Sequence, residues 1–181
     1  MRPAQLVTAS SGLELPTMWR KPNDQSTPQD RQDRPISQER LIELMKENDW
    51  KYAIDSEGVV TGRWDNADVY FNLLRLWGEE PDGLQVRAYW RHELPASAEV
   101  SAATVANAWH RDKLFPKLYA RVDGEKTVIV AEGSFPLRFG ISNQQLNDIV
   151  NAIISTSIDA FKAFEEHFNG QAAGLPKFDG N

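Results

Sequence analysis

The chain has 181 residues, and its 26 acidic and 20 basic side chains give a formal net charge of −6. It contains no cysteine, which excludes disulfides, zinc–thiolate sites and thiol nucleophiles. An acidic chain has no general attraction for phosphate backbones, so nucleic-acid binding would require a local basic patch.

Composition divides the chain into three parts. Residues 1–35 are rich in proline and poor in apolar side chains after Trp19, which predicts a flexible N-terminal arm and linker. The apolar residues 13–19 of this arm either dock on the domain or a partner, or belong to a regulatory arm, and the sequence leaves both interpretations open. Residues 36–168 have the pattern of one folded domain, and residues 169–181 predict a loose tail. No apolar run is long enough for a signal peptide or a membrane span, which predicts a soluble protein. The absence of cysteine agrees with a cytoplasmic location, which we expect.

The domain is predicted to begin with a short helix. Ser37 is a suitable N-cap, and Leu41, Leu44 and Met45 follow at helical spacing. The helix should end near Asp49.

From Tyr52 to His92 the apolar residues recur with a period of two, which is typical of strands. Turn-forming residues at 55–58, 65–68 and 79–83 separate the alternating runs. We therefore expect an antiparallel meander of three or four strands. In its last strand, Leu84 to Trp90, the apolar side chains lie on one face, and the opposite face carries Gln85, Arg87, Tyr89 and Arg91.

A helix with an unusual composition is predicted over 97–114. It has no charged side chain between Glu99 and His110, and several alanines would permit close packing. Because a helix that is apolar on all sides is normally buried, we expect this helix to be buried.

A hairpin and a long helix complete the domain. Pro116 marks a corner, and the strands on either side of Asp123-Gly124 form the hairpin. Ser142 and Gln145 make a capping box at the start of the final helix. The apolar arc of that helix is wider than a single packing stripe, which indicates two partners: the sheet, and either another helix or a second subunit.

The element order is α-β-β-β-(β)-α-β-β-α. Strand runs separated by single helices and short turns predict an α+β domain with a mostly antiparallel sheet and N-terminal, central and C-terminal helices.

Recognisable catalytic chemistry is missing from the sequence. His92, His110 and His167 lack the spacing of a helical metal site, and His110 is interpreted as a hydrogen-bonded residue at a helix end. Asp65 and Asp68 are interpreted as turn residues rather than an acid/base pair. No nucleophile elbow or phosphate-binding glycine loop occurs. We therefore predict no catalytic, cofactor-binding or metal-ligating residues.

A basic surface with tyrosines is the candidate functional feature. Two predicted strands each carry alternating cations and a tyrosine on one face: Arg87, Tyr89 and Arg91, and Lys117, Tyr119 and Arg121. If the strands share a sheet, these side chains form one surface. It would be an ordinary solvated face with arginines paired to glutamates, an anchoring surface for an acidic peptide or partner strand, or a single-strand nucleic-acid site.

Several short motifs resemble the YbjN family, whose members are called "putative bacterial sensory transduction regulators". They are Gly62-Arg63-Trp64-Asp65, LQVRAYW at 84–90, Ala106-Asn107-Ala108-Trp109, Phe115-Pro116-Lys117-Leu118-Tyr119-Ala120-Arg121, Ala131-Glu132 and Gln145-Leu146. The resemblance covers about 36–168. Two features depart from the family pattern, since His110 stands where asparagine is expected and the 1–35 arm is additional.

The resemblance implies a fold similar to type III secretion chaperones, small acidic cytoplasmic proteins that commonly dimerise and hold an extended client segment. It implies no enzymatic activity. We therefore expect a non-enzymatic, chaperone-like regulatory module that is homodimeric and binds a protein partner or client segment. One alternative is a binder of single-stranded nucleic acid or an acidic ligand, which the net charge disfavours. The other is an enzyme with scattered catalytic residues, which would require a deep pocket where His92 or His110 meets a carboxylate.

Overall fold

The computed structural model describes residues 33–171, so most of the predicted N-terminal arm and the end of the predicted C-terminal tail lie outside the described residues. The helices within this range are α1 (Gln38–Glu47), the short 3-10 helix η2 (Ala96–Ala98), α2 (Glu99–Asp112) and α3 (Asn143–Gln171). The strands are β1 (Tyr52–Ile54), β2 (Val60–Trp64), β3 (Ala67–Leu74), β4 (Gly83–Trp90), β5 (Leu94–Pro95), β6 (Lys117–Asp123) and β7 (Lys126–Pro136). The predicted α+β class and element order are confirmed, with the two-residue β5 as an addition.

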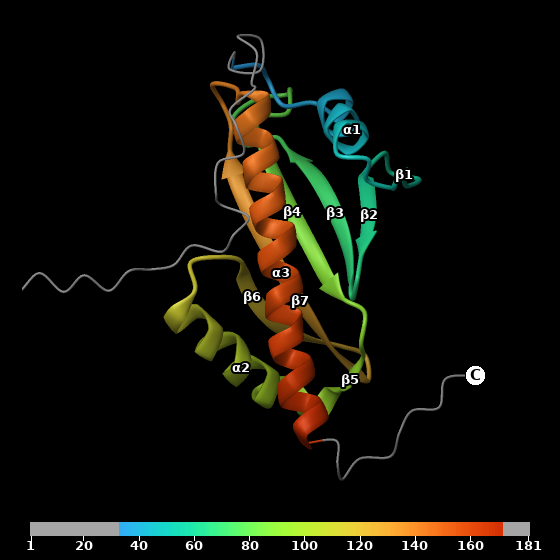
Figure 1. Cartoon of the computed structure of the whole chain (residues 1–181), viewed down its shortest axis with the longest axis vertical. Coiled ribbons are helices and arrows are strands. Elements are labelled where there is room, and N and C mark those ends of the chain that lie inside the picture. Colours follow the sequence, from blue (N-terminus) through green and yellow to red (C-terminus); the bar gives the residue numbers. More distant parts are fainter. Residues whose placement is uncertain (1–32, 172–181) are drawn as a thin grey trace, which may run out of the picture.

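One antiparallel sheet contains all the described strands (Figure 1). The strand order is β1-β2-β3-β4-β7-β5, and β6 also pairs with β7. Residues 130–132 of β7 pair with both β4 and β6, so these two strands lie on opposite edges of β7. As a result β6, which lies far from β4 in the sequence, is placed two strands away from it.

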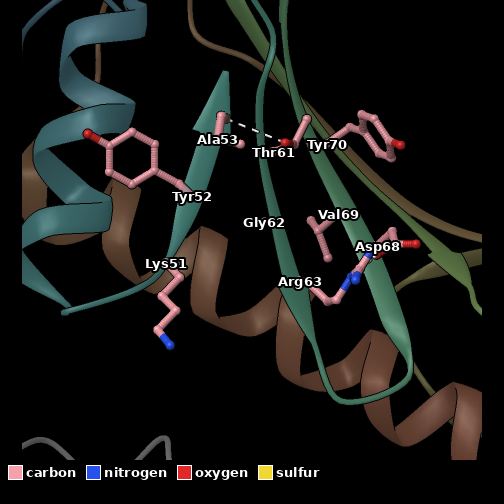
Figure 2. A pocket seen from close by; sticks show the side chains of 9 residues that line it. All are labelled: Lys51, Tyr52, Ala53, Thr61, Gly62, Arg63, Asp68, Val69 and Tyr70. Carbon is pink, nitrogen blue, oxygen red and sulfur yellow. Dashed lines mark hydrogen bonds and ion pairs between the residues drawn. The ribbon is translucent and has the colours of Figure 1, made fainter. Parts of the chain in front are cut away.

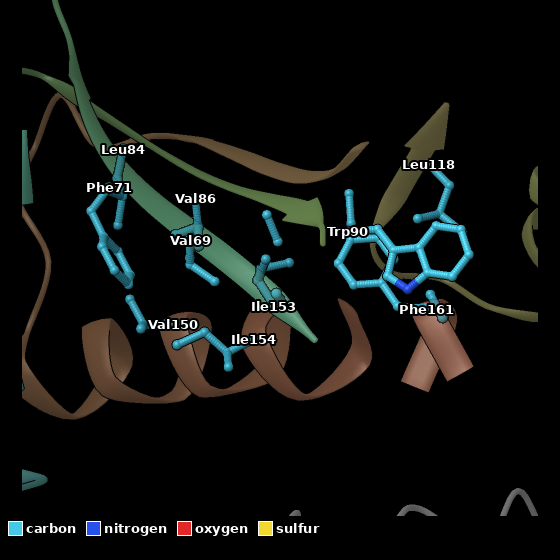
Figure 3. Packing of buried hydrophobic residues seen from close by; sticks show 14 of the residues in the cluster. Val69, Phe71, Leu84, Val86, Trp90, Leu118, Val150, Ile153, Ile154 and Phe161 are labelled. Carbon is cyan, nitrogen blue, oxygen red and sulfur yellow. The ribbon is translucent and has the colours of Figure 1, made fainter. Parts of the chain in front are cut away.

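The hydrophobic core lies between the sheet and the helices. Alternate strand residues such as Val69, Phe71 and Val86 face Val150 and Ile153 of α3 (Figure 3). Every one of these five side chains is buried.

Gly133 in β7 permits the close approach of α3. A Cβ at this position would lie only 2.5 Å from Cδ1 and 2.8 Å from Cγ1 of Ile153. A larger residue would therefore force the Ile153 side chain or α3 to shift.

The helix starts follow the predicted caps. Ser37 Oγ accepts a hydrogen bond from the Arg40 backbone N–H at 3.4 Å. At α3, Gln145 N–H donates to Ser142 Oγ (3.2 Å) and Ser142 N–H donates to Gln145 Oε1 (3.4 Å), which is the predicted capping box.

The prediction that the central helix is buried is wrong. Only Ala102 and Ala106 of α2 are buried, whereas Val100 is 78% exposed. The side chains on the outer side of the helix are mostly small or neutral and polar, such as Ala103 and Asn107, so the absence of charge did not mean an apolar surface. The helix contacts β6 and α3 along one side only.

The wide apolar arc of α3 packs against two partners, as predicted. One partner is the sheet, and the other is α2 of the same chain rather than a second subunit. Ser101 Oγ on α2 and His167 Nε2 on α3 lie 3.2 Å apart at this helix contact. None of the helices among residues 33–171 combines the length and the apolar character that crossing a membrane requires.

Candidate functional site

The sheet face opposite the three helices is the candidate functional surface, and we call it the open face. Strand register places side chains from six strands in one row across it: Ala53, Thr61, Tyr70, Arg87, Glu132 and Lys117. A neighbouring row contains Arg63, Asp68, Tyr89, Val130 and Tyr119. Since side chains alternate between faces, these rows point away from the core residues.

Glu132 is the centre of a hydrogen-bond network on the open face. Its Oε1 accepts from Lys117 Nζ at 2.6 Å, and its Oε2 accepts from Arg87 Nε and Tyr119 Oη, both at 3.1 Å. The Glu132 side chain is 8% exposed, while Lys117 is 65% exposed. Strands on both sides of β7 therefore supply donors to one nearly buried carboxylate.

The network keeps Glu132 ionised. Burial by itself would raise the pKa of Glu132, but the hydrogen bond and charge of Lys117, together with the hydrogen bonds from Tyr119 and Arg87, hold that pKa below its ordinary value. Burial and then the charge of Glu132 raise the pKa of Tyr119, so its hydroxyl stays protonated and acts as a donor. A carboxylate with a lowered pKa is poorly suited to general acid–base chemistry near neutral pH.

Aromatic rings form much of the remaining open face. Tyr70 and Tyr89 meet edge to face with their ring centroids 5.5 Å apart, and Lys117 Nζ lies 5.1 Å from the Tyr119 ring centroid. Val130 is fully buried although no described helix covers it, and its neighbours across the sheet are Tyr89 and Tyr119. The tyrosine rings of the open face therefore contact other side chains of that face.

The six residues predicted for a binding surface are only partly brought together. Arg87, Lys117 and Tyr119 bind Glu132, and Tyr89 lies in the neighbouring row. Arg91 lies beyond the end of β4, where its Nη1 donates to the Asp65 carbonyl at 3.3 Å.

Arg121, the sixth predicted residue, lies near the hairpin turn, with its Nη2 3.4 Å from Asp123 Oδ2. Asp68, interpreted from the sequence as a turn residue, lies in β3 and pairs with Arg63 at 2.8 Å. These ion pairs reduce the free positive charge of the open face.

Sequence reasoning missed Glu132 as the centre of the site. One signal was available, because Glu132 is an acidic residue that directly follows the apolar run TVIVA in a predicted strand. Identifying its partners required the register of β4 and β6 on β7, which local patterns do not provide.

A hollow of about 270 Å³ lies over β1, β2 and β3 (Figure 2). It contains the exposed ion pair between Arg63 and Asp68, and Thr61 Oγ1 donates to the Ala53 carbonyl at 3.4 Å. These groups already have partners, and they offer no nucleophile with an adjacent base.

A larger groove of about 630 Å³ lies at the edge of the sheet, beside the start of β6. It is lined by His110, by the loop and strand residues 113–117, and by residues 132–135 of β7. We call it the β7 groove. Leu114, Phe115 and Phe135 provide apolar surface, and Lys113 and Lys117 provide cations.

Two histidines lie near carboxylates. His110 and Glu132 both line the β7 groove, but His110 Nε2 accepts the Leu118 backbone N–H at 2.8 Å and the Glu132 oxygens bind the three donors described above. His92 Nε2 lies 3.6 Å from Glu165 Oε1, with the His92 side chain 61% exposed. Among residues 33–171, no three His, Cys, Asp or Glu side chains gather as a metal ion would require.

Comparisons with known proteins agree with this architecture. Residues 37–166 match a family model described as "YbjN: Putative bacterial sensory transduction regulator". The structure is similar to the crystal structure of YbjN from E. coli, which is described as a putative transcription regulator. The TM-score is 0.61 at 14% sequence identity, over 77% of this chain and 96% of the other, so this likeness concerns the fold. A search of curated proteins gives no match.

Proposed function

The chain belongs to the YbjN family, and we propose that it is a non-enzymatic regulatory module that binds a segment of another protein on its open face. The observation that carries this proposal is the open face itself, which no helix covers within the described part of the chain. It combines packed tyrosine rings with a nearly buried Glu132 whose oxygens are already hydrogen-bonded. Such a surface offers aromatic contact area with little loss of conformational entropy on binding.

A protein segment fits the open face better than a nucleic-acid strand does. Arg87 and Lys117 both donate to Glu132, and Arg121 pairs with Asp123. A phosphate backbone would have to compete with Glu132 and Asp123 for these cations. The negative net charge of the chain would also repel it. A polypeptide can instead use the tyrosine rings and the arginine stems.

Capture of partners from a lysate of the source bacterium tests the proposal. The full chain and a Tyr70→Ala/Tyr89→Ala variant are immobilised and cross-linked to bound proteins. A Lys162→Glu variant on the outer side of α3 is the control. We expect a partner that the wild-type chain and the control recover in equal amounts, and that the tyrosine variant loses. Recovery of the same proteins by all three chains would contradict binding through the open face.

We also propose that the protein is cytoplasmic and homodimeric. The arc of α3 no longer supports a dimer, because α2 covers it. The outer side of α2 supports one instead, since Val100, Ala103, Thr104 and Asn107 are exposed and uncharged. Thr104 Oγ1 donates to the Val100 carbonyl at 2.9 Å, which leaves its methyl group as the outward surface.

A further inference from the structure

Strand β7 extends beyond its neighbour β6. Residues 126–132 of β7 pair with β6, but β7 continues to Pro136. Along this edge, residues 133–136 have no strand partner within the described part of the chain. The β7 groove lies beside this unpaired end of the strand.

The backbone groups that face this edge follow from the hairpin geometry. Asp123 and Lys126 pair across a two-residue turn in which Gly124 has φ 63°, so they exchange hydrogen bonds, as the closing pair of such a turn does. Along an antiparallel ladder, hydrogen-bonded residue pairs alternate with pairs that are not hydrogen-bonded. Lys117 and Glu132 lie an even number of pairs from Asp123 and Lys126, so their backbones are also hydrogen-bonded to each other.

Two independent contacts support this alternation. The Leu118 N–H donates to His110 at 2.8 Å rather than to β7, as expected for a residue between two hydrogen-bonded pairs. On the other edge of β7, the Phe135 carbonyl oxygen lies 3.3 Å from the position of a Cβ on Gly83, so it points toward β4. The backbone N–H and C=O of Ser134 therefore point to the same edge of β7 as those of Glu132. At Ser134 this edge borders the β7 groove.

The side chains around this edge suit an apolar and acidic segment. Leu114 is 87% exposed and contributes apolar surface beside Phe135. Lys117 donates to Glu132, the one carboxylate in the lining, so the exposed Lys113 is the cation that leaves the groove with a net positive charge.

We propose that the β7 groove binds an extended peptide segment as an additional strand, hydrogen-bonded to Ser134. Alternate side chains of the added strand point to opposite faces. Apolar side chains therefore contact Leu114 and Phe135, and acidic side chains lie near Lys113. This proposal rests on the proposed function and specifies the conformation and charge of the bound segment.

A substitution that removes only the backbone donor tests this binding mode. The probe is a fluorescein-labelled, end-capped peptide of about eight residues that alternates valine and glutamate. Ser134→Pro deletes the N–H, whereas Ser134→Ala keeps it and is the matched control. We expect fluorescence anisotropy to show binding to the wild-type chain and to Ser134→Ala, and binding about fivefold or more weaker to Ser134→Pro. A peptide with lysine in place of glutamate should bind more weakly to the wild type.

Hydrogen exchange on the wild-type chain provides a test that does not depend on the folding of a variant. Adding the valine–glutamate peptide should slow exchange of the Ser134 backbone amide. Unchanged exchange at Ser134, or equal affinity of the proline and alanine variants, would overturn strand addition. If Ser134→Pro still captures the cellular partner that the Tyr70→Ala/Tyr89→Ala variant loses, this inference fails while the proposed function stands.

Discussion

Glu132 shows how a single residue organises the open face. Its carboxylate receives donors from residues 45 and 15 positions away in the sequence, Arg87 and Lys117, and from Tyr119. A buried carboxylate with these donors is stable as an anion, and removal of its charge leaves the donors without an acceptor of equal strength.

We expect Glu132→Gln to lower the free energy of unfolding by about 1–3 kcal/mol, because a neutral amide accepts more weakly and places an N–H₂ group among donors. Urea denaturation at neutral pH measures this change. Glu166→Gln on the exposed side of α3 is the control and should lie within about 0.5 kcal/mol of the wild type. A wild-type-like Glu132→Gln chain would show that the network contributes nothing to stability.

The stabilisation from Glu132 should depend on pH. Its pKa in the folded chain is below the ordinary value of 4.5, so the unfolded chain binds the proton more readily. The contribution is therefore complete well above pH 4.5, declines as the pH falls below that value and disappears below the folded pKa. Repeating the denaturations of wild type and Glu132→Gln at falling pH should make their difference in unfolding free energy shrink. If the difference between the two chains grew in acid instead, the pKa of Glu132 would be raised in the folded chain rather than lowered.

At the scale of elements, the sequence predicted those features whose contacts join residues close together in the chain. The Ser37 cap and the Ser142–Gln145 capping box join residues three positions apart, so sequence patterns identified both. The burial of α2 depends on which of its sides meets β6 and α3, and no pattern within the helix contains that information. The Glu132 network likewise depends on register between strands far apart in the chain.

Two alanines in α2 distinguish its packed side from its exposed side. Ala106 is 4% exposed, whereas Ala103 lies on the outer side. We expect Ala106→Leu to lower the free energy of unfolding by about 1–3 kcal/mol, since added volume in a packed contact forces side chains out of position. Ala103→Leu should change it by less than about 0.5 kcal/mol. Urea denaturation compares the two, and equal losses would mean that both sides of α2 are packed.

At the scale of the whole molecule, the helices among residues 33–171 all cover one face of the single sheet, and no described helix covers the other face. The proposed partner surface and the β7 groove are parts of that uncovered face and its edge. The exposed side of α2 lies elsewhere, on the helical layer. A second copy bound through α2 would therefore leave the open face accessible to a protein segment.

The α2 surface predicts a weak homodimer with a two-fold axis. Antiparallel pairing would bring Glu99 at the start of one helix near Arg111 at the end of the other, which also aligns the helix dipoles favourably. A 14-residue helix is only about 21 Å long, so its one exposed side buries less area than a standard interface. We accordingly expect dissociation in the range of about tens of micromolar.

Sedimentation equilibrium of the full chain at rising concentration measures this association. Ala103→Glu should keep the protein monomeric, because the two-fold axis places two introduced charges near each other in the uncharged contact. Gln144→Glu adds the same charge at an exposed position on α3 and should dimerise like the wild type. A wild-type chain that stays monomeric well above that concentration range would exclude the dimer. A dimer that persists in Ala103→Glu would place its interface on another surface, and the uncharged side of α2 would then need a different explanation.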